Sequence, residues 1–552
     1  MGESAAEAVC PAKRFGEINV AEHEKLNFEE YVRPHPGPLP QERERGKRVC
    51  AIQLSRRDQK SSGRGEVHSE PIDLCRAPSP GAADEVSAKD KSISGRGEGG
   101  PSSHFIASTS VVRLFAFFLC ITACASIASA APAEFKIAGD WDVQVTVSDE
   151  KGTALSTLLH VPKPAWVTVT AEKHDSLPVF NPRAGGWVKG VQLFGVRAQE
   201  TTTPFLLDTT SLVLRAGPEA TSETFRKGEA YEADLSWGTL GRTTNSSIKE
   251  KQAVFASYRH AMLRLDAIVL TRDGRMELRQ GKPLAAAPLA PKVEAGERHL
   301  GNIWLPGVIE KLSLDHLFPI LESAYPEPPR PSPTVAERLT PKALQRLRSG
   351  EPLRVLAWGD SVTVGTYVPD WQQNRWQEQF IARLKERFPK AKIELVTEAW
   401  GGRNTGSYLA QPPGAEHNYK EKVLDAKPDL IVSEFVNDAG LKPEQVEKQY
   451  SKFLADFQAI GAEWIILTPH YVRPDWMGLT RERDIDNDPR PYVAGLRQFS
   501  AKHNVALADA ALRYGRLWRQ GIPHTTVMLN SINHPDARGM KLFADALMEL
   551  FP

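Results

Sequence analysis

The stretch Arg354-Val-Leu-Ala-Trp-Gly-Asp-Ser-Val-Thr-Val-Gly365 decides the fold of the second half of the chain. Its apolar run from Arg354 to Trp358 predicts a short buried strand, and Gly359-Asp360-Ser361 follows where that strand ends. A serine at the carboxyl end of a strand is well placed to act as a nucleophile. The tripeptide alone is weak evidence, because three common residues recur by chance, so its meaning depends on what the later strand ends carry.

The composition of the whole chain limits the function classes. A length of 552 residues predicts two or three domains. The formal net charge of +1 gives no electrostatic reason to expect nucleic acid or an anionic membrane as a partner. All five cysteines precede residue 125, so the rest of the chain has no disulfide framework, thiolate zinc site or cysteine nucleophile; they are Cys10, Cys50, Cys75, Cys120 and Cys124.

Residues 1–110 are rich in glycine, proline, serine and charged residues and have no sustained apolar periodicity. Such a segment cannot bury enough surface to offset its conformational entropy. We therefore expect a disordered N-terminal extension, or a spurious one that results from an over-extended gene model.

Residues 111–130 have the form of a secretory signal. One basic residue is followed by a short apolar core and by Ala128-Ser129-Ala130, a small-residue cleavage site. This pattern predicts a secreted or periplasmic protein. Two alternatives remain: Ile121-Thr-Ala-Cys124 resembles a lipoprotein cleavage box that would anchor the protein through Cys124, and the segment could be a membrane anchor. The core is short for a stable membrane span.

Residues 134–300 alternate polar and apolar side chains with a period of two, as in Trp141-Asp-Val-Gln-Val-Thr-Val147. Asp273-Gly274 between two such runs is a strong hairpin signal. Many short strands at this spacing predict an all-β sandwich or jelly-roll domain. Tryptophans here, Trp166, Trp187 and Trp237, are interpreted either as core residues or as part of a sugar-stacking platform.

The pattern changes again after a linker predicted over residues 301–350, which includes the stiff run Pro326-Glu-Pro-Pro-Arg-Pro-Ser-Pro333. Strands and helices alternate over residues 351–552, which predicts a parallel sheet covered by helices on both faces. The strands are expected at 354–358, 392–398, 429–434, 464–468 and 505–509, and the helices at 371–387, 419–426, 443–460, 490–502 and 537–550.

Chemically useful groups follow several of these strands. After the first strand come Gly359, Asp360 and Ser361, after the second Trp400 to Thr405, and after the third Phe435 to Asp438. A later loop holds Asn530-Ser-Ile-Asn-His534. In such a sheet the site lies at the carboxyl ends of the strands. A hydroxyl, a glycine N–H, an amide and an imidazole are the parts that acyl transfer requires.

These four segments resemble, in order, the motifs of the SGNH (GDSL-type) hydrolases, a family of lipases and esterases. The resemblance covers residues 352–552 and implies a flavodoxin-like parallel sheet. It also implies that Ser361 is the nucleophile and His534 the general base. The oxyanion hole would consist of the backbone N–H groups of Ser361 and Gly402 and the side chain of Asn437. No cofactor or metal is implied.

Two positions depart from the family pattern. Phe435 stands where the family usually has glycine, which affects the loop rather than the amide donor. Ser531 stands where the family has an aspartate that supports the histidine, or Asn530 if the loop is one residue longer. We expect either a Ser–His dyad, with the imidazole held by a backbone carbonyl or by the Asn530 side chain, or another carboxylate. Asp536 is the nearest in sequence, but it is expected to cap the last helix.

The expected protein is therefore a secreted serine esterase that forms an acyl-enzyme on Ser361 and acts on a small-molecule or polysaccharide ester. Trp371, Trp400 and Trp476 near predicted loops favour O-acetyl groups of a carbohydrate. The alternatives are a general carboxylesterase, lipase or acyltransferase, and a non-catalytic carbohydrate-binding protein whose site has decayed. His417, His470, His503 and His524 lack metal-ligand spacing and are expected to be structural or surface residues, with His470 near the pocket wall.

Overall fold

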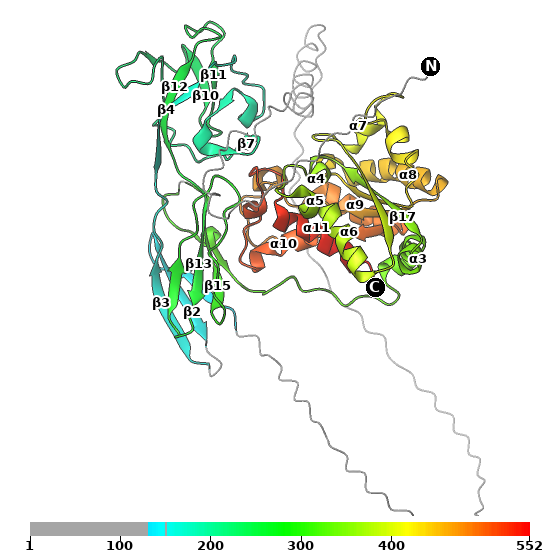
Figure 1. Cartoon of the computed structure of the whole chain (residues 1–552). Coiled ribbons are helices and arrows are strands. Elements are labelled where there is room, and N and C mark those ends of the chain that lie inside the picture. The colour runs from blue at the N-terminus through cyan, green and yellow to red at the C-terminus, as the bar shows by residue number, and fades with distance from the viewer. Residues whose placement is uncertain (1–130, 149–151, 308) are drawn as a thin grey trace, which may run out of the picture. The chain divides into compact units, whose positions relative to one another are not determined.

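The computed structural model describes residues 131–148, 152–307 and 309–552 (Figure 1). The extension expected over residues 1–110 and the signal-like segment at 111–130 lie outside the described residues. No helix in the described part of the chain is both long enough and apolar enough to cross a membrane.

The C-terminal region contains a five-stranded parallel sheet in the order β18-β17-β19-β20-β21. The alternating pattern predicted a parallel sheet, and the resemblance to the SGNH hydrolases implied this flavodoxin-like order. Continuous apolar runs form its central strands because both faces are covered, and all of β19 is buried. The strands are β17 (Pro352–Gly359), β18 (Lys392–Ala399), β19 (Leu430–Glu434), β20 (Glu463–Leu467) and β21 (Ala506–Ala508).

Helices cover both faces of this sheet (Figure 1). α8 (Pro443–Ala459) and α9 (Pro491–His503) pack together on one face, and α6 (Trp376–Arg387) and α11 (Ala537–Glu549) pack together on the other. Trp358 of β17 is fully buried and meets Phe453 and Phe457 of α8 edge to face. The shorter helices are α2 (Val335–Leu339), α3 (Pro341–Ser349), α4 (Ser361–Val364), α5 (Trp371–Asn374), α7 (Thr405–Leu409) and α10 (Ala510–Gly515).

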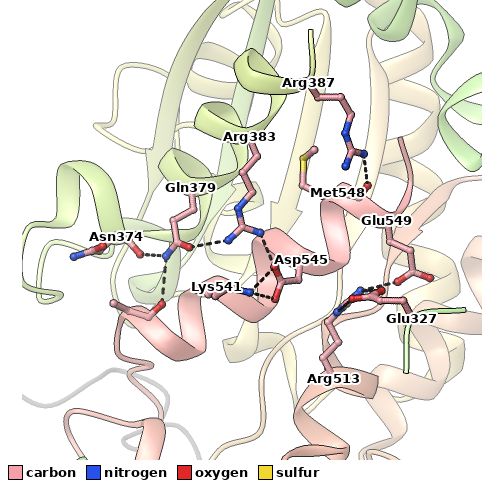
Figure 2. Close-up of polar contacts among 11 residues, drawn as sticks. Glu327, Asn374, Gln379, Arg383, Arg387, Arg513, Lys541, Asp545, Met548 and Glu549 are labelled. Atoms are coloured by element: carbon pink, nitrogen blue, oxygen red, sulfur yellow. Dashed lines mark hydrogen bonds and ion pairs between the residues drawn. The ribbon is translucent and has the colours of Figure 1, made fainter. Parts of the chain in front are cut away.

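Polar contacts reinforce the packing of α6 on α11 (Figure 2). Arg383 of α6 donates to Asp545 of α11 at 2.5 Å. A second contact joins other parts of the chain: Arg513 of α10 donates to Glu327 in the connecting segment, at 2.6 Å. A surface cleft of about 490 Å³ opens beside these residues. Its lining includes Glu327, Arg383 and Asp545 but none of the candidate catalytic residues, so we do not place the reaction there.

The region that precedes the α/β domain is built of antiparallel sheets, as the alternating pattern predicts. Its buried apolar side chains form two separate cores. Val143, Val145, Ile268 and Ile303 belong to one core, which joins the sheet β1-β2-β3 to the sheet β14-β13-β15-β16. The strands are β1 (Glu134–Ile137), β2 (Asp142–Ser148), β3 (Ala154–His160), β13 (Arg264–Leu270), β14 (Met276–Arg279), β15 (Arg298–Leu305) and β16 (Leu317–Pro319).

The second core joins the sheet β4-β12-β8-β9 to the sheet β10-β11-β5 and contains Leu193, Leu214, Leu240 and Ala256. A separate two-stranded hairpin, β6 with β7, lies in the same part of the chain. The strands are β4 (Val167–His174), β5 (Val191–Gln192), β6 (Arg197–Ala198), β7 (Thr201–Thr202), β8 (Val213–Arg215), β9 (Thr224–Phe225), β10 (Tyr231–Asp234), β11 (Thr239–Arg242) and β12 (Val254–His260).

The structure corrects the prediction that residues 301–350 form a linker. β15 continues past residue 300 to Leu305, and β16 pairs with it, so this part belongs to the antiparallel region. Ala343 and Leu347 of α3 are buried in the core of the α/β domain. Residues 321–333, which contain the proline-rich run, have neither helix nor strand and make the actual connection.

Candidate active site

The register of the parallel sheet brings the predicted strand-end groups together. Gly359 of β17 lies opposite Ala399 of β18 and opposite Glu434 of β19. Three neighbouring strands therefore end at the same level, and the loops that follow them meet at one edge. A Cβ at position 359 would lie 2.5 Å from the backbone oxygen of Glu434, so only glycine fits this close approach.

Ser361 begins the short helix α4, directly after the buried strand. Asp360 caps that helix, because its Oδ1 accepts from the N–H of Val362 at 3.0 Å. Its Oδ2 accepts from both the backbone and the side-chain nitrogen of Asn437, at 2.9 and 3.0 Å. Asp360 thus holds the turn and joins the serine loop to the asparagine loop.

Burial dominates the electrostatics beneath the serine. Complete burial raises the pKa of Asp360 to about 6, although the hydrogen bonds from Asn437 and Val362 lower it. Burial and the neighbouring Asp360 carboxyl raise the pKa of Glu434 well above its ordinary range. Oε2 of Glu434 accepts from the Thr363 hydroxyl at 3.3 Å. Its environment therefore favours the neutral form of this second carboxyl.

The glycine loop after β18 lies against Ser361. A Cβ at Gly401 would be 3.8 Å from the Cβ of Ser361. Gly402 is buried and has a φ of 70°, a conformation that favours glycine. Asp438 fixes the far side of this loop by accepting from the Thr405 hydroxyl at 2.6 Å and from its backbone N–H at 3.2 Å.

His534 approaches Ser361 from the loop that precedes α11. Its Nε2 lies 3.2 Å from Oγ of Ser361, a hydrogen-bond distance that suits proton transfer from a serine hydroxyl. The imidazole is stacked on the ring of Tyr367, with the centroids 4.1 Å apart and the planes at 6°. The nucleophile and the base named from the sequence are therefore neighbours, although 173 positions separate them.

A residue that the sequence did not reveal lies on the other side of the imidazole. Nδ1 of His534 is 3.0 Å from Oε1 of Glu200, which comes from the antiparallel region. The pair is at ion-pair distance, although the N–H direction is not well aligned for a hydrogen bond. Local sequence gave no signal for this contact, because it joins positions more than 300 residues apart.

The structure also corrects the predicted role of Asn530. Its side-chain oxygen does not face the imidazole; it accepts from the backbone N–H groups of Ile532, Asn533 and His534 at 2.9 to 3.0 Å. Its amide nitrogen donates to Oε1 of Glu200 at 2.9 Å. Asn530 therefore shapes the loop and orients the carboxylate, and contacts the backbone of His534 rather than its ring.

Asp536 has the capping role that the sequence predicted. Its Oδ1 accepts from the backbone N–H groups of Arg538 and Gly539 at the start of α11, at 2.9 and 3.0 Å. Its Oδ2 lies 2.7 Å from the guanidinium of Arg538. These contacts commit both carboxylate oxygens to the helix, so Glu200 is the acid that faces His534.

His470 and His417, two further histidines of the α/β domain, have different surroundings. His470 is fully buried near the rings of Tyr514 and Phe543, and burial lowers its pKa well below the ordinary value. His417 pairs with Glu398 at 2.7 Å. Within the described ranges, no group of three or more histidine, cysteine, aspartate or glutamate side chains is arranged to hold a metal ion.

The chain resembles known proteins over its C-terminal region. Residues 357–542 match the model of the GDSL-like lipase/acylhydrolase family. Among solved structures, a two-domain esterase (CEX) active on acetylated mannans is 16% identical, with 38% of this chain and 52% of that chain covered and a TM-score of 0.31. A member of the lipolytic protein G-D-S-L family from Veillonella parvula is 21% identical, with 36% and 98% covered and a TM-score of 0.28.

The chain thus spans about half the length of the two-domain esterase. No curated protein matches it. The family match covers the end of the strand that leads to Ser361, the glycine and asparagine loops and His534, which carried the resemblance in the sequence. The C-terminal domain of this chain, over residues 357–542, belongs to the GDSL-like lipase/acylhydrolase family.

Proposed function

We propose that the protein is a serine-dependent hydrolase of carboxylic esters. The observation that carries this proposal is the 3.2 Å approach of His534 Nε2 to Ser361 Oγ at the carboxyl edge of the parallel sheet. In the first half-reaction, Ser361 Oγ attacks the ester carbonyl and its proton passes to Nε2 of His534. The same nitrogen then protonates the departing alcohol and leaves an acyl-enzyme.

Water completes the cycle. His534 takes a proton from the attacking water, the acyl–oxygen bond breaks, and the proton returns to Ser361 as the carboxylic acid leaves. The negative oxygen of each tetrahedral intermediate would be stabilised by the backbone N–H groups of Ser361 and Gly402 and by the side-chain amide of Asn437. All of these groups belong to this chain.

An aromatic cluster near the histidine loop supports a carbohydrate ester as the substrate. Trp187 and Trp237 of the antiparallel region have ring centroids 5.1 Å apart, and Trp476 of the α/β domain lies 6.1 Å from Trp187. Arg473 lies over the Trp237 ring at 4.7 Å. Trp476 is 46% exposed, so its ring offers an apolar face with a cation nearby.

The position of this cluster links it to the reaction. The backbone N–H of Arg473 donates to the carbonyl of Ile532 at 2.8 Å, two residues before His534. A sugar ring stacked on Trp476 would therefore lie close to the catalytic loop. We infer that the preferred substrates are O-acetyl groups of a carbohydrate. Export from the cytoplasm, supported by the signal-like residues 111–130, would bring the enzyme to such polymers.

Hydrolysis of p-nitrophenyl acetate by the full chain tests the reaction. Wild-type protein should release p-nitrophenol and react covalently with a fluorophosphonate probe, and Ser361→Ala should abolish the labelling. The substitution should also lower kcat about 10³-fold or more. Equal rates in the two proteins, at equal thermal stability, would reject the proposal.

Acetylated polysaccharides test the substrate class. Trp476→Ala should raise KM for acetylated mannan or xylan and leave the kinetics on p-nitrophenyl acetate unchanged, because a small ester does not reach the aromatic cluster. Trp166→Ala is a matched control, since Trp166 is 43% exposed but lies over Arg259 in the antiparallel region. A preference for long-chain esters would instead indicate a lipase.

A further inference from the structure

The residue that faces His534 lies at the tip of a two-residue hairpin. Arg197 and Ala198 of β6 pair with Thr202 and Thr201 of β7, so Gln199 and Glu200 form the whole turn. Gln199 has a φ of 54°, which such a tight connection requires. A short hairpin limits the positions that Glu200 can adopt more strongly than a long loop would.

Within the antiparallel region, the side chain of Gln192 holds this turn in place. The side-chain nitrogen of Gln192 donates to the carbonyl of Glu200 at 2.8 Å and to the carbonyl of Trp187 at 3.0 Å. The oxygen of the same side chain accepts from Nε of Arg197 at 3.1 Å. Gln192 therefore ties the tip of the hairpin to its own strand and to the neighbouring backbone.

Three further contacts join the hairpin and the residue after it to the α/β domain. The Gln199 side chain donates to the carbonyl of Tyr367 at 3.0 Å. The Thr201 hydroxyl donates to the carbonyl of Asn530 at 2.7 Å. The hydroxyl of Thr203 lies 2.7 Å from that of Ser531. Tyr367 stacks on His534, and the other two partners belong to its loop, so all three contacts end beside the imidazole.

Glu200 carries a negative charge at this position. Burial raises the pKa of its carboxyl, but the nearby charge of His534 and the hydrogen bond from Asn530 outweigh that effect and lower the pKa to about 2. Its side chain remains 36% exposed, so the carboxylate lies at the edge of the site rather than deep within it.

We propose that Glu200 is the positioning carboxylate of the Ser361–His534 pair, supplied to the α/β domain by a hairpin of the antiparallel region. The inference rests on the proposed ester hydrolysis. When Ser361 attacks, its proton moves to Nε2 and the imidazole becomes positively charged with N–H groups at both nitrogens. Glu200 stabilises that charge and fixes the ring orientation, and it takes no proton itself.

The test compares four variants of the full chain with wild type and Ser361→Ala, using p-nitrophenyl acetate and thermal unfolding. Glu200→Gln keeps the shape and the contact with Asn530 but removes the charge. We expect kcat to fall by about 10²- to 10⁴-fold with little change in KM, the upper figure being that of the corresponding change in a serine protease. Glu200→Asp should recover part of the loss.

Two neighbouring threonines provide a further test and its matched control. Thr201→Val removes the bond to the Asn530 carbonyl and should lower kcat about tenfold by loosening the hairpin. Thr202 donates to the carbonyl of Trp237 within the antiparallel region, so Thr202→Val should keep wild-type kcat on this substrate.

The pH–rate profile separates positioning from general stability. In Glu200→Gln the acid limb should move to lower pH, because the base loses the negative charge that favours its protonated form. If wild type is active, Ser361→Ala is inactive and Glu200→Gln keeps both its kcat and its acid limb, the role of Glu200 is rejected while ester hydrolysis stands. If wild type shows no Ser361-dependent hydrolysis, both proposals fail.

Discussion

Replacing Asp438 with asparagine should change the pH dependence of stability in a predictable direction. Asp438 is only 2% exposed. Its carboxyl accepts hydrogen bonds from the backbone N–H and the hydroxyl of Thr405, and from the hydroxyl of Tyr450 at 3.2 Å. Burial, with a smaller contribution from Asp360, raises its pKa from 3.8 to about 7, although the hydrogen bonds from Thr405 and Tyr450 lower it. The carboxyl therefore binds a proton more tightly in the folded protein than in the unfolded chain.

The sign of the effect follows from this difference. Stability from the protonated carboxyl is fully present below the unfolded pKa of 3.8 and is lost as the pH rises through about 7. About three pKa units at 1.4 kcal/mol each correspond to ~4 kcal/mol across that window. Asparagine stays neutral throughout. It keeps one of the two acceptor oxygens of the carboxyl, and loss of the other acceptor costs about 1–2 kcal/mol.

Asp438→Asn should therefore be less stable than wild type at about pH 4.5 and as stable or more stable at about pH 8.5. Urea unfolding of both proteins at the two pH values measures the difference. Asp456→Asn is a suitable control, because Asp456 also accepts from a tyrosine, Tyr419, but its side chain is 27% exposed. A deficit for Asp438→Asn that stays constant, or that grows as the pH rises, would refute the reasoning.

Three further substitutions test other parts of the site. Glu434 is fully buried, and burial raises the pKa of its carboxyl. Glu434→Gln imitates the neutral form of this group, so the variant should keep wild-type kcat. At alkaline pH it should be more stable than wild type in urea unfolding. Gly402→Ala should lower kcat, because a left-handed backbone conformation costs alanine about 1–2 kcal/mol and this glycine belongs to the site. Gly461→Ala is the control: Gly461 has a similar φ of 77° but lies in open space, so this variant should lower only the melting temperature. Asp536→Ala should cost about 1 kcal/mol of stability through the lost helix cap, measured by thermal unfolding, and keep the pH–rate profile of wild type.

The sequence predicts the α/β half of the site well because the relevant signals are local. Each apolar run that precedes Ser361, Gly402 or Asn437 is long enough to be recognised as a strand. The parallel register then places their ends at one edge without any knowledge of side-chain contacts. The family match over residues 357–542 confirms the resemblance that those segments carry.

The antiparallel half is harder to predict for a physical reason. Alternation identifies strands such as β2 and β12, but it does not say which sheets share a core, because strand pairing in this region joins distant positions. The two cores and the continuation of β15 past residue 300 follow from such pairings. The strands β6 and β7, which carry Glu200 between them, are two residues each and give no periodic signal.

The missing aspartate in the histidine loop and the presence of Glu200 have a common structural explanation. Ser531, at the position where the family carries its acid, has a φ of 56° and directs its hydroxyl to Thr203 of the hairpin segment rather than to His534. Asn530, at the alternative position, binds the backbone N–H of His534 and the carboxylate of Glu200. Both residues of the loop therefore contact the hairpin segment or Glu200, the group that we propose takes the place of the family's acid. Under the roles proposed here for Glu200 and for the aromatic cluster, the antiparallel region takes part in the chemistry as well as in substrate recognition. Weakening the contact between Glu200 and the histidine loop should then lower kcat even where the fold of the α/β domain is intact.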